Sequence, residues 1–541
     1  MVIWFRALVS DMIVSADSEK WRDCLILLLL MVMVSAGCSK VGPDYVRPEV
    51  KVAAAWLEEG DARVRTDAAA NRRWWQVFRD PGLNRLIETA YRENLDLRQA
   101  GVRILEARAQ LGIAVGEFFP QTQDVTGAAQ RMRTSAGAAF PMTSSGGGKF
   151  SGFNYWQSQL GLNIGWELDF WGKFRRAIES ADAALEASIA DYDNALVSLT
   201  ANVATVYTAI RTLERRLAIA RSNVVTQQES LVIAEARFAG GVTSERDVEQ
   251  ARSQLTATQA SIPGLEIQLR QAKDALCVLL GQPPNQLPEL ARGQGVIPQA
   301  PVQVAVGIPA DLLRRRPDIR AAEFNAMAQS ARIGVAKGEL YPAFSLTGNF
   351  GFLASDVGRN NLGDMVNWQN RFGAVGPTVR WPILNYGRLT NLVRVQDARF
   401  QELLLQYQNT VLKAQQEVED NLAAFLRGQE QLDYLTQSVA ASQKSLDLAV
   451  IQYREGITDF TTVLTAQQAL LRTQESLAAA QGAIVTGLIG VYRALGGGWE
   501  IREGQDFVPA ATRKEMSRRT NWGRIIKQGA GKREKEKGSS D

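Results

Sequence analysis

The chain has 541 residues, of which 46% are hydrophobic and 22% are charged; three are cysteines and none is histidine. The absence of histidine removes the commonest general base and the commonest zinc ligand, so serine–histidine, cysteine–histidine and histidine-bound metal sites are excluded. Cys24, Cys38 and Cys277 are too far apart in sequence for a CxxC redox pair or a four-cysteine metal site. Carboxylates and lysines remain, so composition does not forbid an enzyme, but we expect a protein that is not an enzyme and that holds no cofactor and no metal.

The net charge of +4 is unevenly distributed along the chain. Residues Arg513 to Asp541 alone carry +6, whereas the body between residues 38 and 512 is close to neutral. A nucleic-acid-binding protein needs a basic surface on its folded body. The charge distribution therefore argues against nucleic acid as a partner.

An apolar run of 13 residues, Cys24 to Ala36, follows two basic residues near the start of the chain. It is shorter than the roughly 20 residues that cross a bilayer as a helix, and it is typical of the hydrophobic part of a signal peptide. The run ends in Ser35-Ala36-Gly37-Cys38, which resembles a bacterial lipobox, although lipoboxes usually have leucine where Ser35 stands. We expect cleavage before Cys38 and acylation of that cysteine; cleavage by the ordinary signal peptidase is the alternative. No later segment is long and apolar enough for us to predict a membrane-spanning helix.

Two halves of the chain match each other in sequence. Residues Leu97 to Pro120 match Ile319 to Pro342 at an offset of 222, and later segments match at an offset of 215, as far as Leu280-Gly281 against Leu495-Gly496. The chain is thus a tandem duplication of about 84–281 and 306–496. The stretch between the copies, 282–309, holds six of the seventeen prolines and is typical of a linker.

Each copy predicts the same order of elements. A helix of about 35 residues ends near Pro120 or Pro342, two strands flank a loop, and a very long helix, a tight turn and a returning helix follow. Lys173 to Ala239 contains no glycine or proline over 67 residues, and its apolar residues alternate at spacings of three and four, which is typical of a coiled coil. The equivalent stretch in the second copy, Arg388 to Glu455, is interrupted only by Gly428.

The predicted strands have one apolar and one polar face. From Trp156 to Asp169 the even positions are mainly large and apolar and the odd positions are polar or glycine, and residues 344–352 and 375–383 alternate in the same way. The strand near Asp124–Arg133 has the weakest pattern of the four. Such strands fit a transmembrane β-barrel, and the half-buried sheet of a soluble sandwich is the alternative.

Four strands cannot close a barrel, and an open sheet edge in hydrocarbon leaves backbone groups without hydrogen bonds. Because at least about eight strands are needed, several chains must combine their strands. Two chains would form a narrow barrel of eight strands filled by side chains, and three would form a pore of twelve. The polar face favours an open lumen, but the pattern alone leaves the number of chains open.

Several motifs together resemble the TolC-like outer-membrane factor family, in particular the lipoprotein branch (NodT-type) that serves resistance-nodulation-division efflux systems. They are Val41-Gly42-Pro43-Asp44-Tyr45, Trp74-Trp75-Gln76-Val77-Phe78-Arg79-Asp80-Pro81, Arg314-Arg315-Arg316-Pro317-Asp318-Ile319, Tyr453-Arg454-Glu455-Gly456 and Leu495-Gly496-Gly497-Gly498-Trp499. The resemblance covers about residues 35–500. It implies a membrane α+β fold: a homotrimer with a 12-stranded outer-membrane β-barrel, four strands per chain, that continues into a long α-helical coiled-coil tunnel in the periplasm of a Gram-negative cell.

With this resemblance the chain divides into six parts. They are a lipoprotein-type signal peptide at 1–37, an N-terminal periplasmic segment at 38–83, the first repeat at 84–281, a proline-rich linker at 282–305, the second repeat at 306–496, and a basic, disordered tail at 497–541.

The resemblance also implies partners and sites. The partners are a periplasmic adaptor (a membrane fusion protein), an inner-membrane efflux pump and outer-membrane lipid. The adaptor is expected to dock at the two helical turns, which contain Gly240, Gly241, Val242, Thr243, Gly456, Ile457 and Thr458.

One helical turn further along, the family often has an acidic residue that faces the pore, so that a symmetric oligomer forms a carboxylate ring at the periplasmic aperture. Asp247 matches this pattern. In the second copy the family's usual acidic position falls at Thr465, which departs from the pattern, and Asp459 lies nearby but earlier. We expect a weaker ring with Asp247 at its centre; the alternative is that Asp247 only stabilises the start of its helix.

The function implied is that of the outer-membrane exit duct of a tripartite pump that expels drugs or other small molecules. One alternative has the same fold and serves type I protein secretion. Another is a periplasmic coiled-coil adaptor, but we find no glycine-rich β domain of the lipoyl type between the helices.

Overall fold

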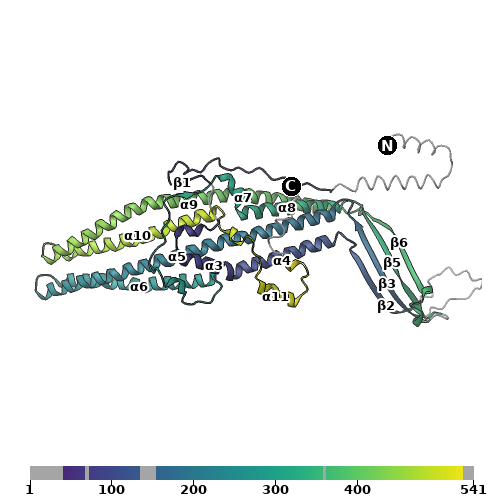
Figure 1. Ribbon diagram of the computed structural model, residues 1–541, viewed down its shortest axis with the longest axis horizontal. Coiled ribbons are helices and arrows are strands. Elements are labelled where there is room, and N and C mark those ends of the chain that lie inside the picture. The colour runs from purple at the N-terminus through teal and green to yellow at the C-terminus, as the bar shows by residue number, and fades with distance from the viewer. Residues whose placement is uncertain (1–39, 68–71, 134–153, 358–360, 528–541) are drawn as a thin grey trace, which may run out of the picture. The chain divides into compact units, whose positions relative to one another are not determined.

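The computed structural model describes residues 40–67, 72–133, 154–357 and 361–527 (Figure 1). Cys38 and the predicted signal peptide lie outside these residues. The chain forms two compact units, which are described separately. The first combines Met1–Val46, Ala109–Ala183 and Ala326–Glu402, and the second combines Arg47–Arg108, Ala184–Asn325 and Leu403–Asp541.

The first unit contains an antiparallel four-stranded sheet in the order β2-β3-β5-β6. Its strands are β2 (Thr122–Arg133), β3 (Asn154–Leu168), β5 (Ala343–Ser355) and β6 (Arg371–Arg380). The register pairs Leu162 of β3 with Val125 of β2 on one side and with Phe350 of β5 on the other, so these three apolar side chains share a face. Asn163 is paired with Asp124 and Asn349 on the opposite face. The predicted apolar and polar faces are therefore confirmed, and β2 is a full strand of 12 residues despite its weak pattern.

Among the residues that the structure describes, much of the apolar face of this sheet is left uncovered. Val125, Val375 and Val379 are 73%, 81% and 62% exposed. In a water-soluble sandwich these side chains would lie against a second sheet. Their exposure is what a lipid-facing sheet requires.

The elements follow the same order in both halves of the chain. The first half contains α4 (Leu95–Gly116), β2, β3, α5 (Lys173–Ala239) and α6 (Glu245–Leu279). The second contains α8 (Pro317–Gly338), β5, β6, α9 (Arg388–Arg454) and α10 (Phe460–Ala494). The two longest helices have 67 residues each and the returning helices have 35 each. The predicted bounds of α5 are confirmed, and those of α9 are confirmed to within one residue.

The helix that we predicted to be about 35 residues long is broken in both halves. In the first half α3 (Pro81–Glu93) ends at Asn94, whose backbone is extended and whose Oδ1 accepts a hydrogen bond from Leu97 N at 2.8 Å. In the second half α7 (Leu312–Arg315) ends at Arg316, just before Pro317. An asparagine that caps the next helix, or a residue that precedes proline, favours an extended backbone and interrupts the helix.

Gly428 lies within α9 and does not interrupt it. Glycine stands there because α10 passes very close to α9 at this point. A Cβ atom at this position would lie 2.9 Å from Ile484 Cγ1 on α10. The glycine therefore permits close helix packing rather than marking a turn.

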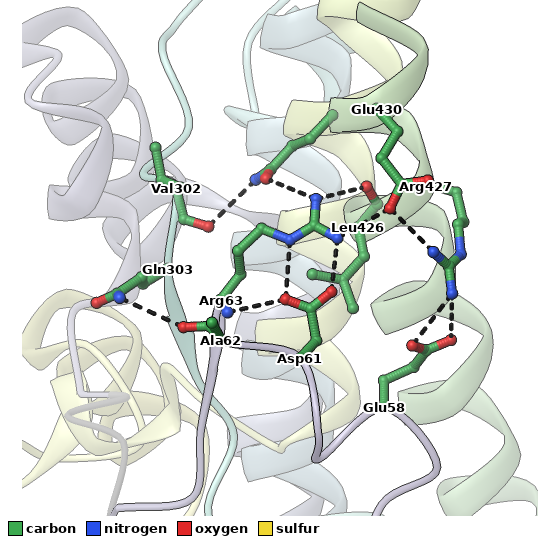
Figure 2. Close-up of polar contacts among 10 residues, drawn as sticks. Glu58, Asp61, Ala62, Arg63, Val302, Gln303, Leu426, Arg427 and Glu430 are labelled. Atoms are coloured by element: carbon green, nitrogen blue, oxygen red, sulfur yellow. Dashed lines mark hydrogen bonds and ion pairs between the residues drawn. The ribbon is translucent and has the colours of Figure 1, made fainter. Parts of the chain in front are cut away.

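The segment that precedes the first repeat runs as a strap over the helices of the second unit. β1 (Val64–Arg65) pairs in parallel with β4 (Val304–Ala305), and the Arg63 guanidinium binds Asp61, Glu430 and the Leu426 carbonyl (Figure 2). Arg427, which like Leu426 and Glu430 lies on α9, forms an ion pair with Glu58 of the strap, with 3.4 Å between its Nη2 and Glu58 Oε1. The hydrogen bonds from Arg63 lower the pKa of Asp61 to about 2. The strap is thus attached by a charged network to the helix that forms much of this unit.

The prediction that residues 497–541 are disordered is wrong for the first part of this tail. Residues 499–527 contain a 3-10 turn (Trp499–Arg502), α11 (Ala510–Arg519) and a second short turn (Ile525–Lys527). Val508, Met516 and Ile526 are buried together with Leu105 of α4. Arg502 donates two hydrogen bonds to Asp193 of α5, which is fully buried. This part of the chain is therefore packed against the body.

α10 also differs from our sequence prediction. It is the one helix among the described residues that is long and apolar enough to cross a membrane, with a mean hydropathy of 1.3 over its most apolar window. Most of that window, 61%, is buried within the protein. Its composition is therefore explained by packing in the helical core.

Candidate functional site

The two helical turns have the same backbone geometry. After α5, Val242 N donates to Arg237 O at 3.0 Å and Gly241 N donates to Phe238 O at 2.9 Å. After α9, Ile457 N donates to Gln452 O at 2.9 Å and Gly456 N donates to Tyr453 O at 3.1 Å. Both patterns are Schellman motifs, in which one residue has a left-handed backbone. Gly241 and Gly456 occupy that position with φ of 69° and 78°, which explains why glycine is needed there.

Each turn presents one apolar side chain to its surroundings. Val242 is 64% exposed and Ile457 is 74% exposed, and each directly follows the glycine with positive φ. Figure 1 shows both turns at the same end of the helical unit. The local geometry thus holds two exposed aliphatic side chains in equivalent positions, where a groove on another protein could take them up.

The two predicted aperture carboxylates lie in the first turns of α6 and α10, but in different environments. Asp459 is exposed at the N-cap of α10 and accepts a hydrogen bond from Thr462 N at 3.3 Å. Asp247 is only 3% exposed, and its Oδ2 accepts a hydrogen bond from Thr243 Oγ1 at 2.5 Å. Its Oδ1 lies 3.6 Å from Arg246 Nη2.

The offset of 215 relates these two carboxylates in an unexpected way. It pairs Ser244 with Asp459 at the N-cap, and it pairs Asp247 with Thr462 three residues later. α6 therefore begins with two carboxylates in its first turn, Glu245 and Asp247, whereas α10 has Asp459 at its N-cap. Both places are favourable for a negative charge beside a helix N-terminus, in line with the alternative explanation for Asp247. Thr465, the departure from the family pattern, donates its hydroxyl to Thr461 O at 2.8 Å.

Sequence reasoning missed an arginine that joins the two hairpins. Arg237, in the last turn of α5, donates hydrogen bonds to the carbonyls of Tyr453 and Arg454 at the end of α9. Its guanidinium carbon also lies 4.8 Å from the centre of the Tyr453 ring. Burial raises the pKa of Tyr453. The sequence did contain a signal for this arginine. At the offset of 215 the second copy has the uncharged Gln452 where the first copy has Arg237, so the two copies differ in charge at this position.

An apolar cluster continues this connection along the helices. Tyr453 packs edge-on against Phe460 with ring centres 5.4 Å apart. The cluster draws on α5, α6, α9 and α10, and its buried members are Leu231, Ala234, Val248, Ala251, Leu255, Leu446, Ala449, Tyr453, Phe460, Val463, Ala466 and Leu470. Inside the helical bundle Gln467 of α10 also donates to Ser230 of α5 at 2.7 Å. The turns are therefore held at the end of a packed four-helix arrangement.

The sequence profile of a known family matches both halves of the chain. The profile is described as "Outer membrane efflux protein", and it matches residues 86–282 and 308–497, which is more than half of the chain. The chain belongs to the outer membrane efflux protein family.

Relatives of known name extend this similarity over almost the whole chain. The toluene efflux pump outer membrane protein TtgC of Pseudomonas putida is 32% identical over 486 residues, which are 89% of this chain and 97% of TtgC. Nodulation protein T of Rhizobium leguminosarum bv. trifolii is 32% identical over 454 residues, which are 83% of this chain and 92% of that protein. The solved structure of the outer-membrane channel OprN is 34% identical with a TM-score of 0.78, covering 85% of this chain and 99% of that one. The largely helical channel fold and the outer-membrane location are thus those of this family.

Proposed function

We propose that this member of the outer membrane efflux protein family is the exit duct of a tripartite efflux pump. It conducts small molecules passively from an inner-membrane pump and a periplasmic adaptor to the exterior. The observation that carries this proposal is the match of the family to both halves of the chain, together with exposed apolar turns at the ends of helices of 67 residues. At ~1.5 Å per residue such a helix is about 100 Å long, which suits a conduit through the periplasm.

The duct is proposed to be a homotrimer that is closed by the strands of three chains. Within the four-stranded sheet, β2 and β6 each pair with one neighbour, so each has a free edge. An unpaired edge in hydrocarbon costs several kcal/mol for each backbone group. Joining β2 of one chain to β6 of the next removes every edge, and three chains give twelve strands. Polar residues and glycine on one face, such as Gln159, Gly161 and Asn163, suit a water-filled lumen.

The turns after α5 and α9 are proposed to be the adaptor-docking elements. Val242 and Ile457 would enter apolar grooves of the adaptor, and the Schellman glycines would allow close approach of the backbone. Thr243 and Thr458 stay near the start of each returning helix, where their hydroxyls bond to Asp247 and Thr462.

Asp247 and Asp459 are proposed to supply the charge at the periplasmic aperture. For Asp247 to line an aperture, its buried carboxylate must become accessible, so the ring would form only when the hairpins separate. Single-channel recording of Asp247→Asn tests this role. Weaker cation selectivity and weaker block by divalent cations are expected, and unchanged selectivity and block would leave Asp247 with only its helix-start role.

Cys38 is proposed to carry the lipid anchor. Labelling cells with an alkyne analogue of palmitate should mark the wild-type protein and not Cys38→Ser. An unlabelled wild type would favour ordinary signal-peptidase cleavage, and a labelled Cys38→Ser variant would place the lipid on another residue.

Efflux is favoured over protein secretion because TtgC, which is similar over 97% of its length, is named for a toluene efflux pump. The direct test is deletion of the gene in its own host, followed by measurement of the intracellular accumulation of a panel of dyes and antibiotics. Accumulation should rise and return to normal when the full chain is supplied on a plasmid. Unchanged accumulation together with the loss of a secreted protein would support the type I secretion alternative instead.

A further inference from the structure

The C-terminal segment carries a concentrated positive charge on an ordered surface. Residues 510–527 hold six Lys/Arg and one Glu. Lys514, Arg518, Arg519 and Arg524 are exposed, and no ion pair joins them to a carboxylate among the residues that the structure describes. Arg513 differs, because it contacts Asp506 at 2.6 Å. We call the four exposed residues the cationic surface.

The backbone under the cationic surface is held in place before any partner binds. Met516 of α11 is buried with Val508 and Ile526 against Leu105. The start of the segment is fixed by the hydrogen bonds from Arg502 to buried Asp193. Lys514 and Arg518 are four residues apart on a helix and are therefore neighbours on its surface. A ligand that binds here does not have to order the backbone, which lowers the cost of binding.

The apolar side chains of the segment are already used within the protein. None of the large hydrophobic residues between 499 and 527 is exposed. A helix that binds to a membrane surface places an apolar face into the lipid and adds electrostatic attraction to it. The cationic surface offers only the second contribution, so a hydrated polyanion suits it better than a bilayer does.

We propose that the cationic surface binds the peptidoglycan of the cell wall through the free carboxylates of its peptide stems. The protein belongs to an outer-membrane family with periplasmic helices, and this polymer is the extended polyanion of that compartment. One exposed ion pair contributes little, but a polymer with repeated carboxylates engages several cations at once. The near-neutral charge of the rest of the mature chain makes this segment the natural place for such a contact.

The test is co-sedimentation of the full-length protein with purified peptidoglycan sacculi. The protein is held in nanodiscs of zwitterionic lipid, so that its own membrane contributes no negative charge. The variant K514Q/R518Q/R519Q/R524Q removes the cationic surface, and R221Q/R252Q/R270Q/K444Q removes four charges from exposed residues of α5, α6 and α9 as a matched control. Truncation after residue 527 separates the cationic surface from the final 14 residues, which carry a net charge of only +1.

Wild type, the control variant and the truncated protein should all bind, and binding should weaken as salt is raised. The cationic-surface variant should bind roughly tenfold more weakly, as expected when several exposed ion pairs are lost together. Equal binding of the two four-residue variants would overturn the proposal, as would loss of binding on truncation alone. Binding of wild type to phosphatidylglycerol vesicles but not to sacculi would also overturn it and would point to anionic lipid.

Discussion

The buried pair Arg502–Asp193 determines whether the C-terminal segment stays folded against the helices. Two guanidinium N–H groups of Arg502 donate to the two oxygens of Asp193, and the Asp193 side chain is 0% exposed. The same guanidinium lies 5.4 Å from the ring centre of Trp499 and 5.0 Å from that of Phe507. Arg502→Ala removes these contacts and leaves the buried carboxylate without its bidentate partner.

Removing one partner of a buried ion pair typically costs about 3–5 kcal/mol. The lower end applies here, because Arg320 Nη1 remains 3.8 Å from Asp193. We expect the opening free energy of residues 499–527 to fall by about 3 kcal/mol, which corresponds to roughly 100-fold faster amide exchange across the segment.

Hydrogen–deuterium exchange with mass spectrometry measures this directly on the full-length protein. Arg513→Ala is the matched control, because its pair with Asp506 is partly exposed and such a pair contributes at most about 1 kcal/mol. The double variant Arg502→Met/Asp193→Asn removes both charges and should recover much of the protection. Exchange in Arg502→Ala no faster than in Arg513→Ala would refute the reasoning, because the segment would then not depend on the pair.

Three further predictions concern the helical turns and the strap. Val242→Asp combined with Ile457→Asp should abolish efflux while leaving the oligomer intact, because a carboxylate replaces the side chain that enters each adaptor groove. Normal dye accumulation in cells with this variant would contradict the docking role. Arg237→Gln introduces the residue that the second repeat has at this place and removes the charged hydrogen bonds to Tyr453 and Arg454. This variant should raise the conductance in planar bilayers, whereas the control Arg252→Gln on α6 should not. Equal conductance of wild type and Arg237→Gln would show that the connection does not restrain the hairpins. The pKa of Asp61 is lowered to about 2, so the stability that its ion pair with Arg63 gives the strap is fully present above the ordinary pKa near 4 and is lost as the pH falls through about 2. Asp61→Asn should therefore loosen the strap already at pH 7, seen as faster trypsin cleavage at Arg63 and Arg65. Cleavage at the wild-type rate would contradict this.

Local patterns were enough to predict much of the fold. The 67 residues of α5 contain no glycine or proline, so nothing in the sequence ends the helix before Gly240. The strict alternation of β3 identified both of its faces, because successive residues of a strand point to opposite sides. The turns were predictable because glycine is strongly favoured where a helix ends in a residue with positive φ, as at Gly241 and Gly456.

The features that sequence reasoning missed depend on contacts between distant residues. Arg502 and Asp193 are 309 residues apart, and nothing near Arg502 in the sequence indicates its partner. The segment around α11 looked disordered because its few apolar residues, such as Met516 and Ile526, become a core only beside Leu105. The connection from Arg237 to Tyr453 likewise exists only once the two hairpins lie together. The break at Asn94 was a local signal that the apolar pattern of the surrounding helices obscured.

The central claim is that three chains combine their strands into one closed duct. Native mass spectrometry of the protein released from outer membranes in mild detergent tests it most directly. A single species with three times the mass of the mature, lipid-bearing chain is predicted. A dimer would imply eight strands and a barrel filled by side chains. A stable monomer would leave the outer edges of β2 and β6 unpaired, so either result would contradict the account.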